Sequence, residues 1–322
     1  MTDARPLISV IIPAFNEEAH ISATLRDVIA YLEGLGEQYR WEIVVVDDGS
    51  SDGTLEAIRA LAATESRLRA APQPSNFNLG QSLRYGFSVA KGDYLVTLDA
   101  DLSYSPEHIG RLIEVLDTTE AKVVIASPYM EGGTVTGVPT SRLVASKAAN
   151  RLLSVAAKGD LTTVTGMVRG YDAVFLEGLD LKAMDAEINA EIIYKAQLMR
   201  AKIVEIPAHL EWTRDEEVKR PFRPSRSVAG FTFVSFLFRP YVLFMVPAAM
   251  LLTLAVILWL AVALVDDTAT ATVVAIAAAT ATVVAVTLGG MGVLSAQAKR
   301  YFEELFHLGT SATIRERRRS TR

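Results

Sequence analysis

Two aspartates, Asp99 and Asp101, are separated by one residue and directly follow the apolar run 94–98. We expect this run to be a buried strand, and in an extended backbone residues two apart project to the same side. Two carboxylates on one side suit a hard divalent cation that also binds phosphate oxygens. Two aspartates at this spacing are common by chance, so whether they indicate a metal site depends on the polar groups expected near them.

Two further polar clusters follow apolar runs in the same way. Asn-Glu-Glu at 16–18 comes after the run 7–13, and Asp-Asp-Gly-Ser at 47–50 comes after the run 41–46. In parallel α/β sheets ligands bind beyond the carboxyl ends of the strands. We therefore expect the three acidic clusters at one edge of a sheet, where they would repel a nucleotide diphosphate without a metal and hold it with one.

The elements that position these clusters alternate between strand and helix. Apolar runs predict strands at 7–13, 41–46, 94–98 and 122–126, and helical spacing predicts helices within 17–34, 54–64 and 80–90. Continuous apolar strands alternating with helices predict an α/β fold with a mainly parallel, helix-covered sheet. The segment 13–17 (Pro-Ala-Phe-Asn-Glu) replaces the glycine-rich turn of a dinucleotide-binding fold, and no Walker A loop is present.

Composition excludes several classes of protein. The chain has 322 residues, a formal net charge of −5, 50% hydrophobic and 21% charged residues. Its mean hydropathy of +0.26 argues against a disordered chain, and its acidic balance argues against a nucleic-acid partner. The absence of cysteine excludes disulfides, thiolate metal sites and cysteine nucleophiles.

The hydrophobic surplus lies near the C-terminus, in two uncharged runs at 240–265 and 268–298, with Asp266 and Asp267 between them. Each exceeds the roughly 20 residues that a helix needs to cross a bilayer. We predict two transmembrane helices; a pair of buried core helices is the alternative. The second run is rich in alanine and threonine, which also allows packing against the first helix through small residues.

Flanking charge predicts the orientation of this hairpin. Lysine and arginine are concentrated before the first run and after the second, whereas the connector carries only two aspartates. The positive-inside rule predicts that both termini lie in the cytoplasm of a multi-pass cell-membrane protein. We expect no cleaved signal peptide, because no positively charged n-region followed by an apolar h-region is found near the N-terminus. We expect four parts: a cytoplasmic domain (1–215), an interfacial juxtamembrane segment or plain linker (216–239), a two-helix hairpin (240–298) and a basic cytoplasmic tail (299–322).

Four motifs in order carry a family resemblance: VIIPAFNE at 10–17, VVVDDGSSDGT at 44–54, NLG at 78–80 and LDADLS at 98–103. Together they resemble family 2 glycosyltransferases of the GT-A fold, in the branch of dolichol-phosphate mannose synthases and polyprenyl-phosphate glycosyltransferases. The resemblance covers about residues 7–215. It implies a Rossmann-like GT-A catalytic domain and an inverting transfer of one sugar from a nucleotide-diphosphate sugar, GDP-mannose or UDP-hexose, to a polyprenyl or dolichyl monophosphate.

The resemblance also implies roles for single residues. Those implied at the nucleotide are Pro13, Phe15, Glu17, Asp47, Asp48 and Gly80. Those implied at a Mg²⁺ or Mn²⁺ ion on the diphosphate are Asp99, Asp101 and Ser103. Those implied at the acceptor phosphate are Arg142 and Ser146, and those implied near the sugar are Arg169 and Glu191.

Several alternatives stay open. Arg142 could be a helix-surface arginine, and Glu191 could form a surface ion pair with Lys195, four residues on. Segment 126–129 (Ala-Ser-Pro-Tyr) lacks an arginine that many synthases carry. The four histidines are expected at the surface or in packing, and a homo-oligomer through the hairpin stays open.

The sequence leaves two rival functions open. A processive polysaccharide synthase would carry Gln-x-x-Arg-Trp, but segment 197–201 has alanine in the last place. A non-catalytic membrane scaffold would not need the intact pair Asp99 and Asp101.

Overall fold

The computed structural model describes residues 5–140, 143, 144, 146–148, 150, 151, 161–212 and 241–320, with only the backbone described for 311–320. Contacts between residues divide the chain into two compact units, which are described separately. The first comprises Met1–Phe231 and Gly309–Arg322, and the second comprises Thr232–Leu308.

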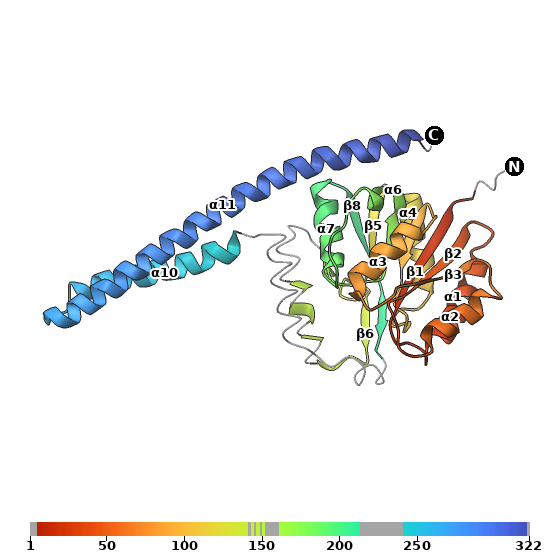
Figure 1. Ribbon diagram of the computed structural model, residues 1–322, viewed down its shortest axis with the longest axis horizontal. Coiled ribbons are helices and arrows are strands. Elements are labelled where there is room, and N and C mark those ends of the chain that lie inside the picture. The colour runs from red at the N-terminus through yellow and green to blue at the C-terminus, as the bar shows by residue number, and fades with distance from the viewer. Residues whose placement is uncertain are drawn as a thin grey trace. The chain divides into compact units, whose positions relative to one another are not determined.

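A seven-stranded sheet forms the centre of the first unit (Figure 1). Its strands are β1 (Leu7–Ala14), β2 (Arg40–Asp47), β3 (Leu68–Pro72), β4 (Tyr94–Thr97), β5 (Ala121–Ser127), β7 (Arg169–Asp172) and β8 (Lys202–Pro207). Their order is β3-β2-β1-β4-β7-β5-β8. β7 is antiparallel to both of its neighbours and all other pairs are parallel, which confirms the mainly parallel sheet.

A second, two-stranded sheet pairs β6 (Thr134–Thr136) with β9 (His209–Glu211) in parallel. The amide of Glu211 also donates to the carbonyl of Ser103 (2.9 Å). β9 thus connects the C-terminal part of the first unit to the loop that follows β4.

Helices cover both faces of the large sheet. They are α1 (Ile21–Gly34), α2 (Thr54–Ala62), α3 (Asn78–Val89), α4 (Glu107–Thr118), α6 (Ala173–Glu177) and α7 (Ile188–Leu198). Alternate β1 residues such as Val10 belong to one buried cluster with residues of α1 and α4. On the opposite face, Gly86 of α3 packs so closely on Ile11 and Val46 that an added Cβ would lie 2.5 Å from the Ile11 side chain.

The strands expected at 7–13, 41–46, 94–98 and 122–126 are present to within one residue at each end. β3, α4, β7 and β8 were not predicted. β7 has the sequence Arg-Gly-Tyr-Asp, which lacks an apolar run, and its place between β4 and β5 depends on contacts distant in the chain.

The second unit is a helical hairpin. α10 (Val242–Val262) lies along the first part of α11 (Thr268–Ser320). Four alanines spaced by seven residues within each helix are the buried apolar residues of the hairpin: Ala248, Ala255, Ala278 and Ala285. Trp259 Nε1 donates to Thr282 Oγ1 across the pair (3.2 Å). The two helices therefore pack through small residues, as the composition of the second run allowed.

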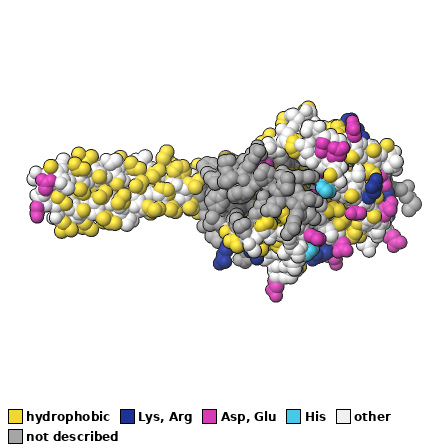
Figure 2. Space-filling model, turned by 90° about the horizontal axis from the view of Figure 1, so that it is seen from below, with side chains coloured by type: hydrophobic (Ala, Val, Ile, Leu, Met, Phe, Trp, Pro, Cys, Tyr) yellow, Lys and Arg dark blue, Asp and Glu magenta, His cyan; other side chains and the backbone are white. Residues whose placement is uncertain are grey.

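Most other hairpin side chains are exposed and apolar, as Figure 2 shows for one face. By length and composition two segments could cross a membrane, Val242–Val262 and Thr268–Thr310. α11 does not end near 298, where the second span was expected to end. It continues to Ser320 through the segment expected to be a tail. The segment 216–239 lies outside the described residues.

Candidate functional site

A cavity of about 590 Å³ opens at the carboxyl ends of β1, β2 and β4. Its walls are formed by Pro13, Ala14, Phe15, Asn16, Glu17, Asp48, Asn76, Asn78, Leu79, Ser82, Asp99, Ala100, Met167 and Asp185. All three acidic clusters of the sequence contribute to it, so the prediction that they meet at one edge of the sheet is confirmed.

The turn after β1 is fixed to the turn after β2 by backbone and side-chain hydrogen bonds. The amide of Asn16 donates to Ser50 Oγ (3.0 Å), and Asn16 Oδ1 accepts from the amide of Ser51 (2.8 Å). The amide of Glu17 donates to Thr54 Oγ1 (2.8 Å). Asn16 has a left-handed φ of 57°, a strained conformation of the kind that is found at binding sites.

Phe15, from the same turn, leaves 43% of its surface exposed while it lines the cavity. An aromatic face in a cavity wall can stack against a planar ring, as side chains do with nucleic-acid bases. The turn after β1 therefore offers a rigid backbone with one exposed aromatic ring.

Two aspartates at the end of β2 have different surroundings. Asp48 Oδ1 accepts from the amide of Phe77 (2.8 Å), which ties the start of α3 to β2. Asp47 is 2% exposed, and no described residue donates to its buried Oδ1. A buried carboxylate oxygen without a donor is costly. Asp48, the next residue, lines the cavity, whereas Asp47 is not among its lining residues, so the expected contact of Asp47 with a nucleotide stays a prediction.

Asp99 and Asp101 lie beyond the end of β4, and residues 100 and 101 form a turn. The premise of an extended backbone across this pair is therefore wrong. Asp99 lines the cavity, whereas Asp101 is not among its lining residues. Asp101 Oδ1 accepts from the amide (3.0 Å) and Oγ (2.6 Å) of Ser103. Leu102, between Asp101 and Ser103, has a φ of 53°, which a residue other than glycine adopts only at a cost.

The donor atoms of this turn fit a hard cation that a ligand also coordinates. Among the described residues no group of three or more His, Cys, Asp or Glu side chains could hold a metal alone. Two carboxylates supply only part of the six to eight oxygens, or the octahedral shell, that such ions need. Asp99 and Asp101 could therefore hold Mg²⁺ or Mn²⁺ once phosphate oxygens complete the shell.

Tyr104 lies close to this turn and is 6% exposed. Burial raises the pKa of its phenol, and the negative charge of Asp99 raises it further. Tyr104 is therefore neutral at physiological pH and adds no charge near the two carboxylates.

Arg169 does not contact the cavity, so its predicted place beside the sugar is wrong. The side chain is completely buried, and burial lowers the pKa of the guanidinium. It donates to the carbonyl oxygens of Gly166 (2.7 Å), Asn189 (2.7 Å) and Val164 (2.6 Å). Arg169 thereby connects β7 to the start of α7 and to the loop before Met167, a cavity residue.

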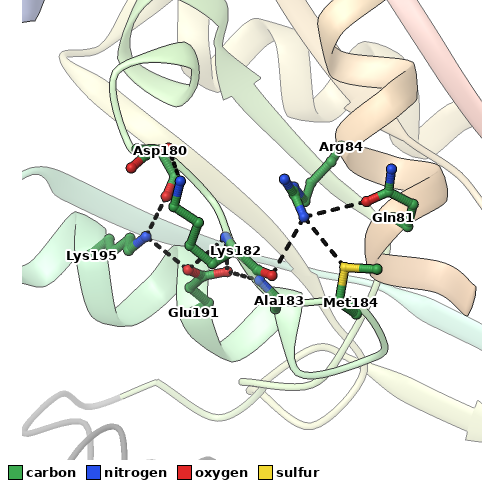
Figure 3. A network of polar contacts seen from close by, with 8 residues as sticks. All are labelled: Gln81, Arg84, Asp180, Lys182, Ala183, Met184, Glu191 and Lys195. Atoms are coloured by element: carbon green, nitrogen blue, oxygen red, sulfur yellow. Dashed lines mark hydrogen bonds and ion pairs between the residues drawn. The ribbon is translucent and has the colours of Figure 1, made fainter. Parts of the chain in front are cut away.

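Glu191 and Lys195 form the predicted i, i+4 pair on α7, with 2.7 Å between Oε1 and Nζ. The pair is not on the surface, because each side chain is only 6% exposed. Glu191 accepts from the backbone amides of Lys182 and Ala183 (Figure 3). Its carboxylate therefore faces the protein backbone and is not a cavity-lining group, which also contradicts a position at the sugar hydroxyls.

The predicted acceptor residues lie partly outside the described chain. Arg142 is not described. Ser146 Oγ lies within hydrogen-bond distance of the Tyr129 hydroxyl (2.8 Å). The carbonyl of Ser146 accepts from Asn150 Nδ2 (3.1 Å), and Asn150 Oδ1 accepts from the amide of Val164 (2.8 Å). Ser146 and Asn150 are thus connected to the loop that leads to Met167.

Gly80 is buried and does not line the cavity. A Cβ there would lie 2.5–2.7 Å from backbone atoms of residues 183–185, so glycine allows that loop to approach α3. Sequence reasoning missed Met167 and Asp185 as site residues. Asn16 and Asn78 belonged to recognised motifs, but nothing in the sequence marked Asp185.

Comparison with known proteins matches residues 9–179 to the model of glycosyl transferase family 2. An undecaprenyl-phosphate 4-deoxy-4-formamido-L-arabinose transferase of Aeromonas hydrophila is 45% identical over 109 residues, 34% of this chain and 33% of its own length. A polyprenol monophosphomannose synthase of Mycolicibacterium smegmatis is 33% identical over 210 residues, 62% of this chain and 75% of its own. This chain thus spans about a third of the Aeromonas protein's length.

Among solved structures, glucosyl-3-phosphoglycerate synthase from Mycobacterium tuberculosis, in complex with Mg²⁺ and uridine-diphosphate, superposes with a TM-score of 0.54. It is 22% identical, and the match covers 72% of this chain and 78% of that one. The expected GT-A fold is confirmed by this likeness, which concerns the fold alone.

Proposed function

Because the chain belongs to glycosyl transferase family 2, we propose that it transfers one sugar from a nucleotide-diphosphate sugar to a polyprenyl monophosphate. The observation that carries the proposal is the acidic wall of the cavity, to which Glu17, Asp48 and Asp99 contribute from the carboxyl ends of three strands. Two relatives whose names include undecaprenyl phosphate and polyprenol add support for the acceptor.

The donor would bind with its base over the turn after β1. Phe15 offers the ring face, and Asp47 offers an acceptor for a base N–H or a ribose hydroxyl. GDP-mannose and UDP-hexoses carry both kinds of donor group. Pro13, Glu17 and Asp48 would form the rest of this wall.

The diphosphate would lie near Asp99. A divalent cation held by Asp99 and Asp101 would neutralise the leaving diphosphate as a Lewis acid. Ser103 would orient Asp101 through its two hydrogen bonds. The walls of the cavity would keep bulk water from the anomeric carbon, which protects the donor from hydrolysis.

The acceptor phosphate needs no protein base. The second pKa of a phosphate monoester lies near 6, so the group is largely ionised at neutral pH. This agrees with the described cavity wall, which contains no histidine. Arg142 and Ser146 would bind the acceptor phosphate, and inversion would follow from its direct attack on the anomeric carbon.

A polyprenyl phosphate stays in the bilayer, so the enzyme must act at the membrane. α10 and the first part of α11 would form the multi-pass anchor, with both termini in the cytoplasm. Residues 1–215 would form the catalytic domain, residues 216–239 the juxtamembrane segment, and residues 240–298 the hairpin. Membrane lipids would surround the exposed apolar side chains of the hairpin.

The test is a transfer assay with the full chain in membranes, using radiolabelled GDP-mannose and UDP-glucose with polyprenyl phosphate. We expect a radiolabelled lipid product from one of the two donors. Asp101→Ala should lose transfer. No lipid product from either donor contradicts the proposed function, whereas undiminished transfer by Asp101→Ala contradicts the metal assignment.

A further inference from the structure

The loop 180–185, between α6 and α7, is fixed from the α7 side by the buried Glu191–Lys195 pair. Glu191 accepts from the amides of Lys182 (3.0 Å) and Ala183 (2.8 Å). Lys195 Nζ donates to the carbonyl of Asp180 (2.6 Å), a residue with a left-handed φ of 47°. Two charges that are removed from solvent therefore hold the first part of the loop, at residues 180, 182 and 183 (Figure 3).

The same loop is fixed from the α3 side. The amide of Gln81 donates to the carbonyl of Met184 (3.1 Å). Arg84 Nη1 approaches the carbonyl of Lys182 (3.4 Å), as Figure 3 also shows. Residues 183–185 pack on Gly80 so closely that no Cβ would fit. α3 and α7 thus hold the backbone of the loop from opposite sides.

The loop, held in this way, places Asp185 in the wall of the cavity. Asp185 and Met167 are the two described lining residues that come from beyond Ala100. Met167 precedes β7, the neighbour of β4 in the sheet, and Asp185 follows α6, the helix after β7. Asp185 Oδ1 accepts from the amide of Ala186 (2.8 Å), which orients the carboxylate.

We propose that Asp185 binds hydroxyl groups of the donor sugar and that the Glu191–Lys195 pair is the device that positions it. This inference rests on the proposed function. A carboxylate repels the diphosphate but accepts hydrogen bonds from hydroxyls, so the ligand group at Asp185 is a diol. Both the sugar and the ribose carry diols. The wall that holds Phe15 and Asp48 provides for the nucleoside, which leaves the sugar for Asp185.

The first test compares the wild type with Asp185→Asn, in the full chain in lipid nanodiscs with Mg²⁺. For Asp185→Asn we expect KM for the transferred donor, GDP-mannose or UDP-glucose, to rise about tenfold or more, the value of a hydrogen bond to a charged group. Kd for bare GDP or UDP should stay within about twofold, because neither contains the sugar. Asp180→Asn is the matched control: its side chain is 73% exposed, and the backbone carbonyl that Lys195 binds is kept.

An unchanged KM in Asp185→Asn overturns the inference and leaves the proposed function standing. Equal weakening of donor and bare nucleotide also overturns it, since Asp185 would then contact the ribose. A wild-type protein that transfers neither sugar and binds neither nucleotide contradicts the proposed function itself.

The second test asks whether Glu191 acts through Asp185. Glu191→Gln should raise the same KM about tenfold. In the double variant with Asp185→Asn, KM should be less than about twofold higher than in Asp185→Asn alone, because the effects of coupled residues are not additive. If the role of Glu191 is only structural, Glu191→Gln would instead lower Tm and kcat. In the double variant its effect on KM would then multiply with the effect of Asp185→Asn.

If Glu191→Gln does not fold, Gly80→Ala displaces the loop from the α3 side and should be equally non-additive with Asp185→Asn. Gly34→Ala is its control, since no atom lies within 4 Å of a Cβ at that position. Full additivity of Gly80→Ala with Asp185→Asn overturns the positioning role.

Discussion

Ser103 donates two hydrogen bonds to one carboxylate oxygen of Asp101, from its amide at 3.0 Å and from its hydroxyl at 2.6 Å. This arrangement makes Ser103 a partner of Asp101. Because β4 ends at Thr97, sheet hydrogen bonds do not fix this turn, and the two bonds from Ser103 orient the Asp101 carboxylate instead.

Ser103→Ala removes the shorter of these two bonds and leaves the backbone bond. Partners of metal-binding carboxylates typically contribute about tenfold or more to metal affinity, so the Mg²⁺ concentration for half-maximal transfer should rise about tenfold. The measurement is a Mg²⁺ titration of transfer at saturating donor. Ser88→Ala is the control, because the hydrogen bond of that hydroxyl among the described residues goes to the carbonyl of Tyr85. An unchanged Mg²⁺ requirement in Ser103→Ala would disprove the coupling.

Removal of divalent metal with EDTA should abolish transfer, and Mg²⁺ or Mn²⁺ should restore it. The reason is electrostatic, since Asp48, Asp99 and Asp185 face the cavity that would receive a diphosphate. Asp99→Asn should reduce kcat at least about 100-fold, measured in the same assay. Full activity in EDTA would show that the acidic wall binds its ligand without a cation.

Arg169→Met should destabilise the first unit by about 3 kcal/mol or more, because two buried carbonyl oxygens and one part-buried carbonyl oxygen would lose their donors. Urea unfolding of the full chain in detergent micelles measures this loss, and Arg169→Lys should recover part of it. A variant with wild-type stability and a specific loss of donor binding would instead place Arg169 at the substrate.

Ala278→Leu should separate the two helices of the hairpin. Ala278 is fully buried, and overpacking of a close helix contact typically costs about 1–3 kcal/mol. Thermal unfolding in micelles followed by tryptophan emission measures the effect, since Trp259 bonds to Thr282 across the interface. Ala279→Leu, at the exposed neighbouring position, is the control. Equal behaviour of the two variants would contradict the alanine packing.

Lowering the pH from 7.5 to 5.5 should lower Tm in part through His108. Burial lowers the pKa of His108 below its ordinary 6.5, and Arg111 lowers it further, against the Ser105 carbonyl and Glu107. Nε2 accepts from the amide of His209, so protonation would put two donors face to face. The unfolded chain binds the proton more readily, so stability is lost as the pH falls below about 6.5.

The measurement for this effect is the slope of Tm against pH in wild type and His108→Gln. We expect a smaller slope in the variant, because glutamine at position 108 has no group that titrates in this range. Identical slopes would mean that the pKa of His108 is the same in the folded and the unfolded chain.

The sequence was sufficient for the strands that carry the cavity, because β1, β2 and β4 are continuous apolar runs followed by polar residues. It also predicted Phe15, Glu17, Asp48 and Asp99, which directly follow those runs or lie close after them. Local order along the chain was enough in these cases, since parallel strands bring their carboxyl ends to one edge.

The errors concern charged residues whose environment depends on distant contacts. Arg169 and Glu191 were expected at the sugar, but each is buried against backbone groups that lie 3 to 20 residues away in the chain. Asp185 was missed for the same reason, since its place in the cavity wall depends on α3 and α7 together. No pattern of neighbouring residues shows whether a carboxylate will face a cavity or the protein backbone.

The length of α11 has a consequence for the membrane arrangement proposed above. At 1.5 Å per residue, its 53 residues extend for about 80 Å, whereas the hydrocarbon of a bilayer is about 30 Å thick. More than half of this unbroken rod must therefore stand in water or among lipid headgroups. A thicker or thinner bilayer would change the tilt of the helix. Because the part of the helix outside the hydrocarbon is longer than the hydrocarbon is thick, a small change of tilt would move the C-terminal end of the helix a larger distance relative to the lipid surface.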